Sequence, residues 1–126
     1  MKRILLQDKS LSLSALDSFR ELVKLELKPL TFEIDITHCL SKSPLPTDNY
    51  QLIITHPHTA EAYKCCIPII NEATKKNIPV VLIYGEASIT DKIYAIAQDL
   101  NLETKLSEMG TRRKVYAACI RKYLVD

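Results

Sequence analysis

Residues 50–58, Tyr-Gln-Leu-Ile-Ile-Thr-His-Pro-His, combine an apolar run with a polar ending. The run at 50–55 is rich in β-branched residues, which is typical of a strand that is buried on both faces of a sheet. A second run, at 79–84, is the most apolar strand candidate of the chain, and a shorter one lies at 4–6. These runs alternate with helical patterns, and this alternation predicts an α/β fold with a parallel sheet.

The segments between these runs complete the alternation. Helical spacing of apolar residues predicts a first helix that begins at a serine cap and stops before Pro29. Residues 31–37 alternate between polar and apolar, as in an edge strand with one wetter face. The helical pattern at 59–76 contains Pro68, where we expect the helix to kink or restart, and Asn77 ends it. The candidate cap residues of the first helix are Ser10, Ser12 and Ser14.

The remaining segments predict a helix capped by Ser88 or Thr90, a weak polar strand at 103–107, and a last helix that follows Gly110. Five strands and about four helices imply right-handed crossovers with helices on both faces of the sheet. We therefore predict one domain over residues 1–126, a three-layer α/β/α sandwich with a flavodoxin-like five-stranded parallel sheet. Its strand order is 2-1-3-4-5, because the two polar strands belong at the edges.

The composition is that of one globular domain. The chain has 126 residues, of which 47% are hydrophobic and 25% charged, and this length buries a sizeable core. The net charge of +2 gives no strong attraction to nucleic acid or membranes. We expect neither a signal peptide nor a membrane span, since no apolar run approaches about 20 residues. Four cysteines without framework spacing predict reduced thiols and a cytoplasmic location.

Three segments resemble the receiver domains of bacterial response regulators. The opening Met-Lys-Arg-Ile-Leu-Leu at 1–6, followed by Asp8, is similar to the start of a receiver. Residues 50–54 and 78–83 are similar to its third and fourth strands. The resemblance covers nearly the whole chain in order and spacing. It implies a signalling or regulatory module that contacts proteins through its last helix–strand–helix surface.

The residues that a receiver uses for phosphotransfer are mostly missing. The resemblance implies an acidic pair after the first strand, where this chain has Asp8 and then Lys9. It implies an acceptor aspartate at the end of the third strand, where His56 stands, and a Thr or Ser at Tyr84. It implies a lysine at the end of the fifth strand, where the nearest match is Glu108, with Lys105 three residues earlier. Aspartyl phosphorylation needs a carboxylate nucleophile and a divalent cation, so we expect no such reaction and no cofactor.

The alternative is a small enzyme or a ligand-binding domain with a cleft at the strand carboxyl ends. The candidate cleft residues are Asp8, Lys9, His38, His56, His58 and Tyr84. Imidazole and thiolate groups also suit zinc or copper, and the candidate ligands are His38, Cys39, His56 and His58. No metal-binding spacing supports such a site, so we expect His58 to cap or solvate a loop and His56 to be partly buried.

The predicted partner surface consists of the last two helices and the polar strand at 103–107. Aromatic and arginine side chains are frequent interface anchors, and the last helix is basic. The predicted anchors are Tyr94, Arg112, Arg113 and Tyr116. The partner would be another protein or a second copy of the chain. The alternative is that the tyrosines only cover the sheet and the charges only solvate the helix.

Overall fold

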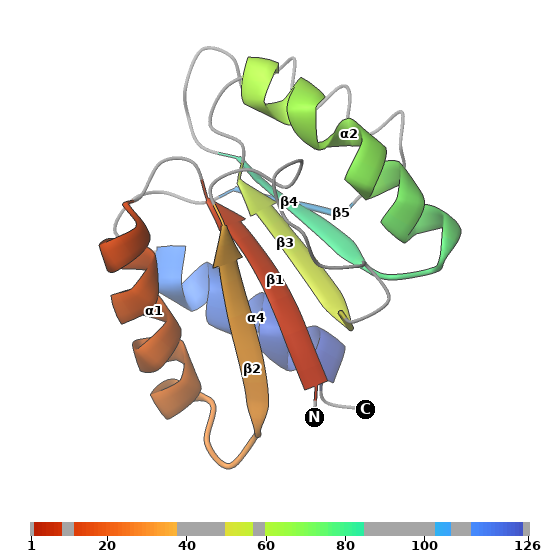
Figure 1. Ribbon diagram of the computed structural model, residues 1–126. Helices are drawn as coiled ribbons and strands as arrows, with labels where there is room; N and C mark the ends of the chain where they lie inside the picture. Colours follow the sequence, from red (N-terminus) through yellow and green to blue (C-terminus); the bar gives the residue numbers. More distant parts are fainter. Residues whose placement is uncertain are drawn as a thin grey trace.

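The computed structural model describes residues 2–8, 12–37, 50–56, 60–84, 103–106 and 112–124. The strands are β1 (Lys2–Asp8), β2 (Phe32–Thr37), β3 (Leu52–His56), β4 (Val80–Tyr84) and β5 (Glu103–Leu106). The described helices are α1 (Leu13–Glu26), α2 (Ala60–Lys75) and α4 (Arg112–Leu124). The strands form one parallel sheet in the order β2-β1-β3-β4-β5 (Figure 1). The predicted α/β fold with a parallel sheet is confirmed.

The central strands are buried on both faces of the sheet. Ile4 lies opposite Ile34 and Leu52 in the register, and all three belong to a core cluster with residues of α1 and α4. Leu5 and Ile53 are also buried, and they point to the opposite face because side chains alternate along a strand. That face is covered by α2 (Figure 1). Burial on both faces explains why the strands read as continuous apolar runs in the sequence.

The first helix begins and ends close to its predicted signals. Ser12 is the N-cap, and its hydroxyl accepts a hydrogen bond of 3.1 Å from the backbone N–H of Ala15. The helix ends at Glu26, shortly before Pro29. Its buried residues Leu16 and Val23 are two turns apart and face the sheet. The serine cap and the stop before the proline are therefore confirmed.

The second helix runs through its proline. It is one continuous element with Pro68 inside it, so the restart that we considered there does not occur. Asn77 ends the segment in the left-handed conformation, with φ 60°, which asparagine tolerates better than most residues. The N–H of Ile78 returns to the carbonyl of Ala73 at 2.9 Å and closes the helix end. The next predicted helix, capped by Ser88 or Thr90, lies outside the described residues.

Two strands are longer than their apolar runs. β1 continues through Gln7 to Asp8, and β3 continues to His56, because both polar ends still pair with a neighbouring strand. All three side chains are buried. The polar residues that end these runs therefore belong to the sheet, and they form the site described next. None of the helices in the described ranges has the length and apolarity needed to cross a bilayer.

Candidate functional site

Asp8 and His56 meet at the carboxyl ends of β1 and β3. They lie directly opposite each other in the parallel register, so their side chains project to the same face of the sheet. Nδ1 of His56 lies 3.2 Å from Oδ1 of Asp8. Both side chains are buried: Asp8 is 0% exposed and His56 3%, so the histidine is more deeply buried than we expected. The structure thus brings together two of the predicted cleft residues.

The third member of this cluster is Tyr116, which comes from α4. Its hydroxyl donates a hydrogen bond of 2.5 Å to Oδ2 of Asp8, and its ring lies edge-on to Phe19 of α1. At 1% exposed, Tyr116 is not available as the surface anchor that we predicted. The sequence signal that favours the buried position is its helical spacing with Ile120 and Leu124, which are also buried.

The cluster holds a carboxylate in a place without free access to water. A buried carboxylate is costly unless hydrogen-bond donors surround it, and here each oxygen of Asp8 has a donor or imidazole neighbour. The imidazole acts as donor in the tautomer that carries hydrogen on Nδ1, and it forms an ion pair with Asp8 when it is protonated. The arrangement therefore stabilises Asp8 in place and connects two strand ends to α4.

A second buried polar pair lies one residue earlier, on the other face of the sheet. Thr55 Oγ1 donates a hydrogen bond of 2.5 Å to Oε1 of Gln7, and both residues are 0% exposed. They are opposite each other in the register, as Asp8 and His56 are. We did not single out Gln7 and Thr55 from the sequence. The signal was present in two consecutive polar residues at the end of an apolar strand, because such residues face opposite sides of a buried sheet.

Several other predicted site residues lie outside the described part of the chain, namely Lys9, His38, Cys39, His58 and Tyr94. Tyr84 ends β4 and Arg112 begins α4, but their side chains are not described. Arg113 is exposed, and its Nε lies 3.9 Å from Oε2 of Glu26. Within the described ranges, no three potential metal-binding side chains come together.

A contrasting polar cluster lies toward the starts of the strands. One Nη atom of Arg3 lies 2.9 and 3.0 Å from the two carboxylate oxygens of Asp35, and Tyr50 donates a hydrogen bond of 2.9 Å to the same group. Burial raises the pKa of the Tyr50 hydroxyl, and the hydrogen bond to Asp35 raises it further as the second-largest cause. The hydrogen bond and the charge of Asp35 raise the pKa of Arg3. Arg3 and Asp35 are partly exposed, so this cluster borders solvent.

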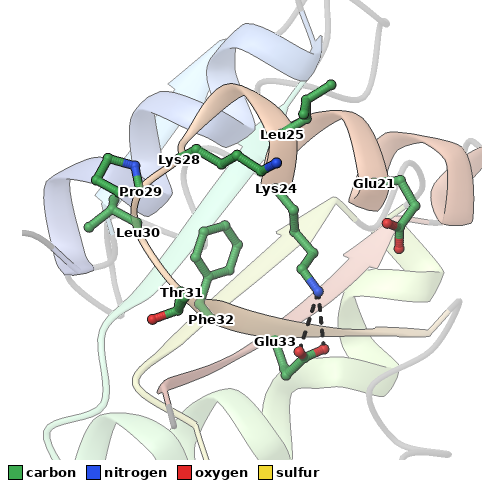
Figure 2. Close-up of a pocket in the computed structure, with 9 residues that line it drawn as sticks. All are labelled: Glu21, Lys24, Leu25, Lys28, Pro29, Leu30, Thr31, Phe32 and Glu33. Carbon is green, nitrogen blue, oxygen red and sulfur yellow. Dashed lines mark hydrogen bonds and ion pairs between the residues drawn. The ribbon is translucent and has the colours of Figure 1, made fainter.

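A groove of ≈ 580 Å³ lies at the same end of the molecule, between the end of α1 and the start of β2 (Figure 2). Its lining residues are Glu21, Lys24, Leu25, Lys28, Pro29, Leu30, Thr31, Phe32 and Glu33. A smaller hollow of ≈ 320 Å³ adjoins it, and both share the turn at 29–31. These hollows are lined by residues at the opposite end of the sheet from Asp8 and His56, so they are separate from the predicted cleft.

Comparison with known proteins shows the fold. No protein-family model and no curated protein matches the sequence. A solved response regulator receiver domain protein from Clostridium thermocellum is similar, with a TM-score of 0.62 and 16% identity over 100% of both chains. An adenylate cyclase structure from Rhodopirellula baltica has a TM-score of 0.54 and 17% identity, over 97% of this chain and 89% of that chain. The chain therefore has a receiver-like α/β fold.

Proposed function

We propose that this protein is a signalling or regulatory module that acts by protein–protein interaction and lacks aspartyl phosphorylation. Its whole chain, residues 1–126, would form one three-layer, flavodoxin-like domain of the bacterial receiver type. The observation that carries the proposal is the buried pairing of His56 with Asp8 at the ends of β3 and β1. A cytoplasmic location is part of the proposal, and it rests on the four cysteines without framework spacing.

The chemistry of the pair opposes phosphotransfer. His56 stands where the resemblance to receivers implies the acceptor aspartate, and an imidazole cannot form an acyl phosphate. Asp8, the remaining carboxylate, already has Tyr116 on one oxygen and His56 beside the other. Binding magnesium there requires oxygen ligands in place of these contacts. The strand ends therefore support a structural role better than a metal-dependent reaction.

The same cluster connects the strand ends to the proposed interaction surface. Tyr116 binds Asp8 from the inner side of α4, while the exposed residues of that helix include Arg113, Lys114, Arg121 and Lys122. This outer face is basic, so it suits a partner with an acidic surface. We place the interface on this face of α4 together with β5 and the segment before it. Tyr94, Arg112 and Arg113 remain its proposed anchors, and the partner is another protein or a second copy of the chain.

A titration with phosphate analogues tests the missing reaction. We expect beryllofluoride or acetyl phosphate with magnesium to leave the amide NMR spectrum unchanged, because the acceptor carboxylate is absent. A receiver with an intact acceptor aspartate is the positive control. A magnesium-dependent shift centred on His56 contradicts the proposal.

Charge reversal tests the interaction surface. Replacing Arg112 and Arg113 by glutamate should weaken capture of the native partner and leave the melting temperature nearly unchanged, since the side chain of Arg113 is exposed. Lys75→Glu, an exposed change on α2, is the matched control. Normal binding by the Arg112/Arg113 variant shows that the surface lies elsewhere.

A second candidate function is favoured by one observation. Asp8 orients the imidazole of His56, and a carboxylate–imidazole pair is an arrangement that general acid–base catalysis uses. In this case a ligand would enter the strand-end cleft, with Asp8, Lys9, His56 and Tyr84 around it. The test compares two variants in the native host. If His56→Ala folds but no longer supports the protein's function there, while the Arg112/Arg113 variant does, the cleft is the functional site.

A further inference from the structure

The outer face of α1 carries unusual apolar exposure. In the part of the chain that the structure describes, the exposed large hydrophobic residues are Leu13, Leu22 and Leu25, at 52%, 45% and 60%, and all three are on this helix. Leu22 and Leu25 are three residues apart, so they are neighbours on one side of the helix. Because the other large hydrophobic residues with a described side chain are buried or partly buried, the face around Leu25 is a candidate for contact with another molecule.

This face continues into the groove beside β2. Leu25 forms part of the groove wall, and the buried ring of Phe32 contributes from the strand (Figure 2). The groove therefore offers a hollow next to a protruding leucine. A molecule that lies along α1 can place an apolar side chain in this hollow while it covers Leu25.

The charges around Leu25 have an ordered arrangement. Lys24 is neutralised by Glu33 of β2, with its Nζ 3.3 Å from Oε1 (Figure 2). The side chain of Glu21 is 70% exposed, and its Oε1 lies 3.7 Å from Nε of Arg20, which is a long ion pair. For the exposed Lys28, the described structure records no ion pair or side-chain hydrogen bond. The face thus presents one weakly paired acid and one available cation.

The positions of these charges make the face complementary to itself. Glu21 precedes Leu25 by four residues on α1, so these two lie on one side of the helix, and Lys28 lies in the turn that follows it. All three line the groove. A twofold axis beside Leu25 packs the end of α1 and the following turn of one copy against the same segment of the other, with Glu21 of each copy facing Lys28 of its partner copy. The same axis brings Leu25 against its symmetry mate, as an isologous interface requires. We propose that a second copy of this chain binds the outer face of α1 in this way.

This interface uses α1 and the edge of β2, whereas the function proposed above uses α4 and β5. The two surfaces approach each other at Glu26 and Arg113, and variants at Glu21, Leu25 and Lys28 test this interface separately from the other. Charge complementarity favours a second copy over an unrelated protein, because an exposed acid precedes Leu25 and an exposed cation follows it, and a twofold axis beside Leu25 brings the two together. One helix face with a groove makes a small interface, so we expect a weak dimer, with a dissociation constant on the order of 100 µM.

Sedimentation equilibrium of the full chain up to about 1 mM tests the proposal. We expect a monomer–dimer equilibrium in the unmodified protein. Lys28→Glu and Glu21→Lys should each weaken the dimer about tenfold or more, because each change creates two like-charge contacts. The double variant Glu21→Lys/Lys28→Glu restores opposite charges across the axis, so it should recover most of the affinity.

Leu25→Ser should also weaken dimerisation about tenfold, through the loss of apolar contact. Leu13→Ser is its matched control, since Leu13 has similar exposure and lies about 18 Å away along the helix. Lys75→Glu on α2 is the control for charge, and the melting temperature of every variant should stay close to that of the unmodified protein at a low, monomeric concentration. A protein that is monomeric at about 1 mM overturns the proposal. A dimer that tolerates Lys28→Glu and Leu25→Ser, or that the double variant does not restore, overturns it equally.

Discussion

The two ends of the central sheet hold a carboxylate in different ways. At the strand ends, Asp8 is fully buried between His56 and Tyr116, which come from β3 and α4. Toward the strand starts, Asp35 is partly exposed and is shared by Arg3 and Tyr50. Both carboxylates have at least two protein partners. The difference between them is access to water.

This difference decides what each cluster contributes. Solvent replaces a lost partner at Asp35, and dissolved salt weakens the attraction of Arg3 for it. Water and salt do not act in the same way on the buried Asp8. An unsatisfied group there retains the full cost of its lost hydration. The strand-end cluster should therefore determine stability, whereas the strand-start cluster should respond to the solution conditions.

The largest effect is expected for His56→Asp, which restores the residue type that receivers carry. Two carboxylates would then face each other in the register of β1 and β3, so we expect a loss of about 3–5 kcal/mol in the free energy of unfolding at pH 7. Urea denaturation measures this change. His56→Asn, which has nearly the same size but no charge, should cost clearly less. Equal losses in the two variants would show that packing, rather than charge, decides the outcome.

Tyr116→Phe removes one donor from Asp8 and keeps the ring in place. The buried carboxylate then loses the hydrogen bond from the Tyr116 hydroxyl to Oδ2, and the free energy of unfolding should fall by about 1–3 kcal/mol. Lys114→Ala, at an exposed position of the same helix, is the control and should cost less than about 0.5 kcal/mol. If the two variants are equally stable, Tyr116 does not support Asp8 in solution.

The sequence was sufficient for the α/β fold with its parallel sheet because the signals for these elements are local. Buried runs such as 79–84, the cap at Ser12 and the helix end at Asn77 each follow from neighbouring residues. The strand-end cluster depends on register and on packing between distant elements. The predicted topology brings Asp8 and His56 together at the carboxyl ends of two neighbouring strands. The contact of Asp8 with Tyr116, however, joins residues 108 positions apart in the chain. The helical spacing of Tyr116 with Ile120 and Leu124 indicates the buried face of α4, but no local signal identifies Asp8 as the acceptor of its hydroxyl.

Tyr50→Phe tests the strand-start cluster through pH. At pH 7 it should cost about 0.5–1.5 kcal/mol, because it removes a single hydrogen bond to a carboxylate that keeps Arg3. The pKa of Tyr50 is raised in the folded protein, so its hydroxyl stabilises the fold fully below the unfolded pKa of about 10 and progressively less above it. From pH 9 to pH 11 the unmodified protein should therefore lose more stability than Tyr50→Phe. Parallel declines would indicate that Tyr50 ionises equally in both states.

Arg3→Ala should have the smallest effect and the strongest dependence on salt. The guanidinium is partly exposed and Tyr50 still donates to Asp35 after its removal, so the melting temperature should fall less than in Tyr116→Phe. Raising sodium chloride from about 20 mM to 1 M should shrink the difference between Arg3→Ala and the unmodified protein, because the Debye length falls to about 3 Å. The corresponding difference for Tyr116→Phe should not change, since the hydrogen bond of Tyr116 to Asp8 is buried.

Arg121→Ala, at an exposed position of α4, controls for the loss of one positive charge. Equal salt dependence in the Arg3 and Tyr116 variants would mean that water reaches both carboxylates alike, and the contrast between the two ends of the sheet would be lost.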